Sequence, residues 1–371
     1  MEGSWVCAEI ERQLKGSVVF TEKEVLTGRW DEPDCEENPR NWSTMKKIFH
    51  VAPVALLCLS VTAGSSMITP GIFQIEEKFH VSETVALLSL SMYVLGLALG
   101  PLIAAPLSET WGRIIVYRTT MPIYILFILG AGYTNSFAGL IICRLFAALA
   151  GAPCLAVGAG TVADLFAPHR MGTAGAFIVM APFLGPCIGP VIGGFAASFE
   201  SYRWTQWCTI FLALLAYATV LPTHETHRLV LLKKRAKELD LPPPVPKIPT
   251  KEAIHLLLTI TIFRPVCMLF YEPIVLLFSL YNAFTFSILF AFFEAFPYVF
   301  MGVYHFNIWQ YGLTFLAIGG GVLLGVVVAI IIDQTVYQKK VEYDDAGEVI
   351  PQAPERRLFV AIIGAVCLPV G

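Results

Sequence analysis

The sequence predicts an all-α protein that crosses a membrane several times. Of its 371 residues, 56% are apolar and only 14% are charged, and the mean hydropathy is +0.68. Ordinary soluble domains carry about 25% charged residues, so the composition excludes a soluble globular enzyme as the first interpretation, and it also excludes a disordered chain. The net charge of −3 gives no indication of nucleic-acid binding.

The apolar runs identify the individual helices, because a spanning helix needs about 20 mostly apolar residues. Six runs lie at residues 48–72, 84–107, 114–133, 137–163, 173–197 and 204–221, and two more at 273–296 and 312–332. A ninth run opens at Leu358 and has 14 residues up to Gly371, which is about 21 Å of helix at 1.5 Å per residue. Since the hydrocarbon core is about 30 Å thick, we expect the ninth helix to be truncated.

This spacing divides the chain into four parts. They are a tail at residues 1–46, a six-helix bundle at 47–222, a linker at 223–264 and a partial second bundle at 265–371. The linker carries a basic run at 233–237 and three prolines at 242–244. Six helices, a basic linker and a new series of helices are typical of transporters that are built from two six-helix halves.

The basic residues of the short loops predict the orientation in the membrane. The loops at 108–113 and 168–171, the linker and the segment at 333–357 contain most of the lysine and arginine residues. The loops on the other side retain only Lys78 and Arg203. Because cytosolic loops carry an excess of positive residues, we expect the N-terminus and the linker to be cytosolic.

Three stretches of sequence carry more specific information. The first runs from Gly100 to Arg113, the second places Arg144 inside helix 4 and Asp164 at its end, and the third is GPCIGPVIGG at residues 185–194. Together they resemble the signature motifs of the major facilitator superfamily and, more narrowly, its fungal branch of twelve-helix drug:proton antiporters. Shorter supporting matches lie at residues 38–43, 202–207, 272–276 and 293–297.

The resemblance implies both a fold and a function. The fold is a polytopic, all-α membrane protein with a major-facilitator-type six-helix N-terminal bundle and a partial C-terminal bundle. The function is secondary-active efflux of amphipathic organic compounds, such as drugs, toxins or secondary metabolites, by proton antiport in the plasma membrane. The implied partners are membrane lipids, the small organic substrate and protons. The sequence has no CxxC pair, HExxH pattern or histidine cluster, so we expect no enzyme activity, no cofactor and no metal site.

The short second bundle leaves a different interpretation open. The resemblance covers residues 38–371, so we expect the chain to be C-terminally truncated relative to a twelve-helix transporter. Alternating access moves one half against the other around a site at the membrane midplane. The alternative is therefore a truncated relative that does not transport and is inactive, or that acts as a regulatory or binding partner. Open small-residue faces on helices 5 and 8 would then favour self-association.

The loop between helices 2 and 3 holds the first group of candidate site residues, Glu109, Gly112 and Arg113. Gly112 allows a tight turn. A carboxylate at a helix C-terminus is repelled by the helix dipole, so Asp164 needs a cation, and Arg113 is the expected partner. The resemblance implies that these residues form a gate that latches the halves together in the outward-open state, with Glu109 facing the start of a helix 11. The alternative is an exposed loop with ordinary positive-inside charges.

Arg144 is the second candidate, because it is a charged residue inside an apolar helix. It lies about 10 Å into helix 4, counted from Phe137 at 1.5 Å per residue. A charge near the middle of the bilayer costs about 2.5–3.5 kcal/mol on insertion scales, so such a residue normally faces a watery cavity and has a partner. We therefore expect a role in substrate binding or proton coupling. The alternative is a side chain that snorkels to the outer interface.

Helices 5 and 7 supply the remaining candidates. In helix 5, glycines recur every four residues on one face and prolines kink the helix; the resemblance identifies an antiporter motif that marks exporters (Gly185, Pro186, Gly189, Pro190, Gly193 and Gly194). That motif is expected to seal the contact with helix 8, where Gly321 and Gly325 have matching spacing, although generic small-residue packing is the alternative.

In helix 7, Tyr281 and Asn282 could line an aromatic cavity or belong to a lipid-facing stripe. Glu272 precedes this helix and has either a structural or a proton-binding role.

Overall fold

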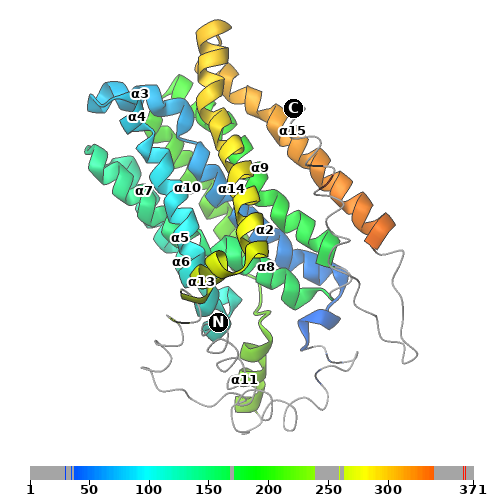
Figure 1. Ribbon diagram of the computed structural model, residues 1–371. Coiled ribbons are helices and arrows are strands. Elements are labelled where there is room, and N and C mark those ends of the chain that lie inside the picture. The colour runs from blue at the N-terminus through cyan, green and yellow to red at the C-terminus, as the bar shows by residue number, and fades with distance from the viewer. Residues whose placement is uncertain are drawn as a thin grey trace.

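The computed structural model describes residues 30, 35, 37–167, 171–238, 259, 263–337, 362 and 364. In these residues every regular element is helical, which confirms the predicted all-α class. Seven helical segments are long and apolar enough to cross a membrane: Thr44–Phe79, Glu83–Trp111, Arg113–Tyr133, Phe137–Leu165, Met171–Phe199, Pro273–Val303 and Ile308–Thr335. Figure 1 shows that most of them form one bundle. The expected ninth helix lies outside the described residues apart from residues 362 and 364.

The first span is interrupted before its end. Helix α2 (Thr44–Ser66) begins after Ser43, whose hydroxyl accepts a hydrogen bond from the Lys46 amide at 3.4 Å, a typical N-cap. A single 3₁₀ turn, η2 (Thr69–Gly71), then separates α2 from α3 (Ile72–Phe79). Because a helix end leaves its last four carbonyl groups without intrahelical donors, this interruption provides acceptors inside the bundle.

The helices of the other five expected spans follow the predicted order. They are α4 (Glu83–Ala86) with α5 (Leu88–Trp111), then α6 (Arg113–Tyr133), α7 (Phe137–Gly151) with α8 (Pro153–Leu165), α9 (Met171–Phe199) and α10 (Tyr202–Val220). Pro153 begins α8 at its first position, where its missing N–H is tolerated. Helix α10 is not among the seven most apolar segments, because its first turns contain Arg203 and Gln206. It nevertheless packs against α2, α6 and α9.

A continuous apolar core joins these helices. Helix α2 lies against α9, and α7 lies against both α5 and α6. The main cluster is made of fully or nearly fully buried side chains, among them Leu57, Val61, Tyr93, Tyr117, Met121 and Tyr124. A second, smaller cluster surrounds α3 and includes Ile68, Ile75, Leu140 and Tyr202. The break between α2 and α3 therefore lies between the two clusters.

The part of the chain after the linker packs less extensively. It consists of α13 (Arg264–Tyr271), α14 (Pro273–Phe296) with a π-helical turn η5 (Pro297–Val303), and α15 (Ile308–Ile332) with a second such turn, η6 (Asp333–Tyr337). Helix α15 runs along α9 (Figure 1). An aromatic cluster of Phe293, Tyr311 and Phe315 joins α14 to α15. Glu272 is the N-cap of α14 without a side-chain hydrogen bond to it, and Pro273 occupies the first turn.

The linker begins with a helix of its own. Helix α11 (Arg228–Glu238) follows seven residues after the end of α10. Figure 1 shows it beyond the end of the bundle, where it also contacts α5. We call this end of the bundle the linker end. The predicted boundaries of the four parts of the chain, and the cytosolic position of the linker, stay predictions.

Candidate functional site

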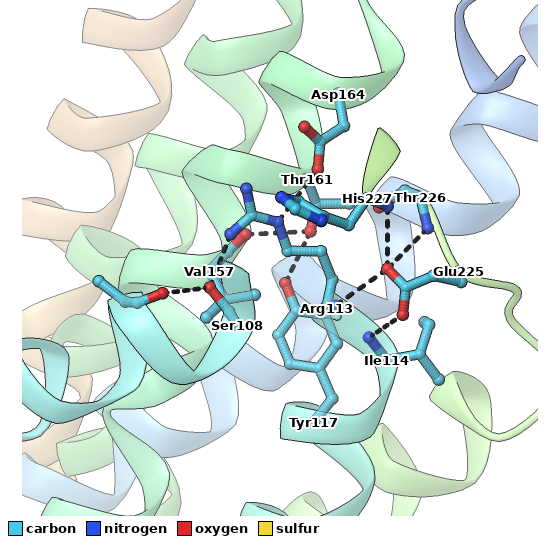
Figure 2. A network of polar contacts seen from close by, with 11 residues as sticks. Ser108, Arg113, Ile114, Tyr117, Val157, Thr161, Asp164, Glu225, Thr226 and His227 are labelled. Carbon is cyan, nitrogen blue, oxygen red and sulfur yellow. Dashed lines mark hydrogen bonds and ion pairs between the residues drawn. The ribbon is translucent and has the colours of Figure 1, made fainter. Parts of the chain in front are cut away.

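A polar network closes the linker end of the six-helix bundle. Figure 2 shows side chains from the end of α5, the start of α6, the end of α8 and the segment after α10 meeting around Arg113. We call Ser108, Arg113, Asp164, Glu225 and His227 the linker-end network. It joins residues that are up to 119 positions apart in the sequence, so it fixes the relative positions of four helix ends.

Arg113 is the centre of this network. Its Nε donates to Oδ2 of Asp164 at 3.0 Å, and its Nη1 donates to Oγ of Ser108 at 2.6 Å. The Arg113 and Asp164 side chains are only 11% and 18% exposed, which limits screening by solvent. A Cβ on Gly160 would come within 2.8 Å of the Arg113 guanidinium, so a larger residue at that position would require the guanidinium to shift. The expected partnership of Asp164 with Arg113 is therefore present.

Glu225 braces the same site from the segment after α10. Its carboxylate accepts the backbone N–H groups of Arg113 and Ile114, at 2.9 and 3.2 Å, and so caps the start of α6. Oε1 also accepts the amides of Thr226 and His227, at 3.0 and 2.9 Å. A carboxylate is favourable there because the N-terminus of a helix is its positive end.

Gly112 is the residue that allows this approach. Its φ of 102° lies in a region that side chains rarely adopt, and a Cβ there would collide with the Glu225 carboxylate. Glu109, by contrast, is exposed. The sequence identified Gly112 as a turn residue but did not identify Glu225, because nothing in the linker sequence predicts contact with a residue more than 100 positions earlier.

His227 completes the network as a neutral group. It is 8% exposed, and its Nδ1 has no hydrogen-bond partner among the described residues. Burial lowers the pKa of His227 below its ordinary value, and the nearby Arg113 charge lowers it further, whereas Asp164, Glu225 and Glu109 act in the opposite direction. The imidazole is therefore held uncharged near neutral pH.

Arg144 lies deep inside the bundle and is fully buried. Its Nε donates to the Ser89 carbonyl at 2.8 Å, and its Nη2 donates to the carbonyls of Gly64 and Ser65 at 3.1 and 3.0 Å. Nη1 donates to Oε1 of Gln206 at 3.3 Å. The guanidinium also lies 4.7 Å from the ring centre of Tyr93.

This geometry corrects the expected surroundings of Arg144. The side chain faces neither an open cavity nor the outer interface, because Gln206 and the carbonyl groups of α2 and α5 enclose it. Gly64 and Ser65 belong to the last turn of α2, so the positive charge lies at the negative end of that helix. The break between α2 and α3, which the hydropathy pattern does not predict, supplies these acceptors. The expected role in substrate binding or proton coupling is a separate question and stays a prediction.

The glycine face of α9 packs against α2. A Cβ on Gly185 or Gly189 would collide with α2, and one on Gly193 would collide with the Met67 backbone directly after α2, so these glycines permit close helix contact. Pro190 has no N–H to donate to the Pro186 carbonyl, and Oγ of Ser66 donates to that carbonyl at 3.0 Å instead. The motif therefore seals the contact between the first and fifth spans.

The opposite contact, between α9 and α15, uses other glycines than expected. Gly312 lies against Pro190 and Gly194, with 3.4 Å from its ideal Cβ to the Gly194 Cα, and Gly319 lies near Cys187. Gly321 and Gly325 meet nothing within 4 Å, so the predicted match with the helix 5 glycines was wrong in its residues. The sequence spacing alone could not decide which face of α15 turns toward α9.

A further contact between the two parts of the chain lies near the linker end. Asp333, directly after α15, accepts a hydrogen bond from Oγ1 of Thr173 at 2.9 Å. It lies against Gly172, and both residues belong to the first turn of α9. A carboxylate is stabilised at this positive helix end, so Asp333 fastens α15 to α9.

A cavity of about 650 Å³ opens beside this contact. Its walls come mainly from α2 and α9 and are largely apolar, with Lys47 and Gln334 among the polar residues; the other lining residues include Ile48, Leu56, Phe166, Phe177 and Met180. Arg144, Tyr281 and Asn282 do not line it. Tyr281 is exposed on α14, and Nδ2 of Asn282 donates to the Phe278 carbonyl in its own helix at 2.9 Å. In the described part of the chain no cluster of His, Cys, Asp or Glu side chains could hold a metal ion.

Comparison with known proteins agrees with this architecture. The family model described as Major Facilitator Superfamily matches residues 54–371. Polyamine transporter 4 of Saccharomyces cerevisiae is 36% identical over 369 residues, covering 92% of this chain and 55% of the relative. Efflux pump radE of Floropilus chiversii is 33% identical over 348 residues, covering 92% of this chain and 64% of the relative. The chain therefore spans between half and two thirds of the length of these two fungal relatives.

A solved structure supports the same fold. The proton:xylose symporter XylE superposes with a TM-score of 0.53 over 80% of this chain and 70% of the symporter, at 14% sequence identity. At that identity the likeness concerns the arrangement of helices alone.

Proposed function

Since the chain belongs to the Major Facilitator Superfamily, a family of membrane transporters and not of enzymes, we propose that it serves in secondary-active efflux of amphipathic organic compounds in exchange for protons. Drugs, toxins and secondary metabolites are the proposed substrate class, and the plasma membrane is the proposed location. One similar relative is named as an efflux pump. Because the chain spans only part of the length of its relatives, the activity of a whole transporter is itself part of the proposal.

The observation that carries the proposal is the packing of the α9 motif. Its glycines allow α2 to approach on one side, and Gly194 meets Gly312 of α15 on the other. Helix α9 is thus the main element through which the first bundle contacts the following helices. Small residues let such helices approach each other closely, and a close contact between the two parts of the chain is expected of a transporter whose halves move against each other.

The linker-end network is the proposed inner gate. Its ion pair, together with Asp333 on the first turn of α9, ties several helix ends together on the side that we place in the cytosol. Paired groups that are only partly buried can separate and rehydrate at modest cost. Opening of this end therefore requires Arg113 to leave Asp164 while the rest of the bundle stays packed.

The cavity between α2 and α9 supports the proposed substrate class. Its walls are mostly apolar, and the few polar residues lie among them, which is the usual arrangement of a site for small amphipathic molecules. Proton coupling is assigned to Arg144, with Tyr281 and Asn282 kept as candidates for substrate contact. Self-association is proposed through the open glycine face of α15, since α2 already covers the glycine face of α9.

The test is an efflux assay in a drug-sensitive yeast. The chain is expressed as it stands and also extended by the C-terminal helices of the radE relative, and extrusion of a fluorescent amphipathic cation is followed in energised cells. We expect extrusion that a protonophore abolishes, and that is strongest for the extended form. Normal membrane insertion of both forms without any protonophore-sensitive extrusion of a panel of amphipathic compounds would contradict the proposal.

A further inference from the structure

The segment before the first span is docked on the linker helix α11. Trp30 is only 2% exposed, and it packs against Leu232 and Ala236 of α11, each 1% exposed. Cys35 and Leu231 lie at the edge of the same cluster. An indole that is this well buried removes a large apolar surface from water, so the contact is a specific docking site and not a loose approach.

Polar contacts fix this segment at both of its ends. Nδ2 of Asn38 donates to the Trp30 carbonyl at 3.0 Å, in buried surroundings. Oε2 of Glu37 lies 3.4 Å from Nη1 of Arg235 on α11. At the other end, Nζ of Lys47 in α2 donates to the Arg40 carbonyl at 2.7 Å. The segment thus bridges α11 and the start of the first span.

The charges of the two partners are complementary. Residues 31–37 contain five acidic residues and no basic one, whereas α11 carries four basic residues between positions 233 and 237. Attraction between an acidic segment and a basic helix guides their association. The same chain therefore supplies both the docking helix and the two residues, Trp30 and Cys35, that lie against its apolar face.

The docked helix is directly connected to the inner gate. Helix α11 begins at Arg228, immediately after His227, and Glu225 lies only three residues before its start. Oε1 of Glu225 accepts the amides of Thr226 and His227 as well as the amide that begins α6. A displacement of α11 is therefore transmitted to the Glu225 carboxylate over three residues of chain.

We propose that Trp30, Cys35 and residues 37–42 form an N-terminal clasp that holds α11 in place and thereby keeps Glu225 on the start of α6. With the clasp docked, the linker-end network stays closed. Release of Trp30 frees α11, loosens the Glu225 cap and lets Arg113 leave Asp164 more often. The clasp thus sets how readily the linker end opens, and this role goes beyond the export activity proposed above.

The direct test measures docking without any transport. Membranes that contain the full chain are treated briefly with trypsin, and mass spectrometry quantifies cleavage after Lys233, Lys234, Arg235 and Lys237. Replacing Trp30→Ala is expected to accelerate this cleavage at least fivefold, and to accelerate maleimide labelling of Cys35 by a similar factor. Leu232→Ala is expected to do the same from the other side of the contact, because alanine favours the helix but removes the packing.

A matched control separates docking from simple fraying of α11. Glu238→Gln removes the exposed Lys234–Glu238 pair on a part of α11 that the clasp does not cover, and it is expected to leave Cys35 labelling unchanged. Trp30→Phe keeps an aromatic ring and should restore most of the protection. Cleavage and labelling rates in Trp30→Ala and Leu232→Ala that equal those of the parent chain would overturn the proposal.

The link to the gate needs its own measurement. Ser108 is fully buried in the network, so a Ser108→Cys thiol reports opening of the linker end. We expect Trp30→Ala to increase labelling of that thiol at least threefold from the linker side. Faster trypsin cleavage without faster Ser108→Cys labelling would mean that the clasp holds α11 but does not act on the gate, and would overturn this part of the proposal. Neither readout depends on export.

Discussion

Two arginines of the six-helix bundle, one partly buried and one fully buried, are held in different ways. Arg113 has a carboxylate partner at 3.0 Å, and its side chain keeps 11% exposure. Arg144 is fully buried, and in the described residues its hydrogen bonds go to three backbone carbonyls and one amide side chain. A charge pair at a helix end can separate and be rehydrated, whereas a guanidinium enclosed by backbone acceptors cannot move without disturbing several helices. We conclude that one arginine is suited to a gate and the other to a fixed centre.

The largest effect is expected at Arg144. Replacing Arg144→Ala leaves buried carbonyl acceptors of Gly64, Ser65 and Ser89 without this donor, and each such group costs about 1–3 kcal/mol. We expect loss of export together with a marked fall in the melting temperature of the purified protein. Arg144→Lys should recover only part of both, since an ammonium group cannot reproduce the planar donor set. An unchanged melting temperature in Arg144→Ala would contradict the fixed-centre interpretation.

A smaller effect is expected at Asp164. Asp164→Asn removes the negative charge from a charge-assisted hydrogen bond that contributes about 1.5–3 kcal/mol. The expected outcome is a smaller fall in melting temperature than in Arg144→Ala, a linker end that opens more easily, and export reduced several-fold. Efflux rate and melting temperature are measured side by side. A fall in melting temperature as large as that of Arg144→Ala would remove the distinction between the two arginines.

Replacing Glu225 is expected to change export less than replacing Asp164. Glu225→Gln keeps one acceptor oxygen but loses the charge that favours the α6 N-terminus, which is worth about 1 kcal/mol. We expect a moderate decrease in export and faster thiol labelling at the linker end. Glu200→Gln, on an exposed residue between α9 and α10, is a suitable control. Equal behaviour of the two variants would show that Glu225 does not brace the network.

The smallest effect concerns pH. Burial lowers the pKa of His227, so the unfolded chain binds a proton at this residue more readily than the folded protein does. The contribution of the neutral imidazole to the free energy of unfolding is therefore fully present above about pH 6.5. It is lost as the pH falls through the lower pKa that His227 has in the folded state. We expect His227→Asn to flatten the fall in melting temperature between pH 7 and pH 5. His80→Asn, on an exposed residue outside the network, should not.

Local patterns in the sequence predicted much of the fold. Apolar runs located the helices because burial in lipid requires about 20 apolar residues in succession. The position of Asp164 at a helix C-terminus predicted its need for a cation, and Arg113 lies there. The hydropathy pattern does not predict the break between α2 and α3, because its residues, Met67 to Gly71, continue a run without charges.

Contacts between distant segments were not predictable in the same way. Glu225 caps α6 from 112 residues away, and Trp30 packs on a helix about 200 residues later. No local sequence pattern around either residue predicts which distant segment it contacts. Gly312 replaced the predicted Gly321 and Gly325 at the α9 contact, since a four-residue glycine spacing does not say which face of α15 turns toward α9. Helix rotation is set by the whole packed interface, which a single sequence does not contain.

The accessibility of one buried thiol tests most directly whether the linker-end network is a gate. Ser108→Cys is introduced on a background whose native cysteines are replaced by serine or alanine, and its maleimide labelling rate is measured from the linker side with and without Asp164→Asn. If the Arg113–Asp164 pair closes this end, labelling is slow in the first protein and at least fivefold faster in the second. Equal rates in the two proteins would show that the linker-end network is not a gate.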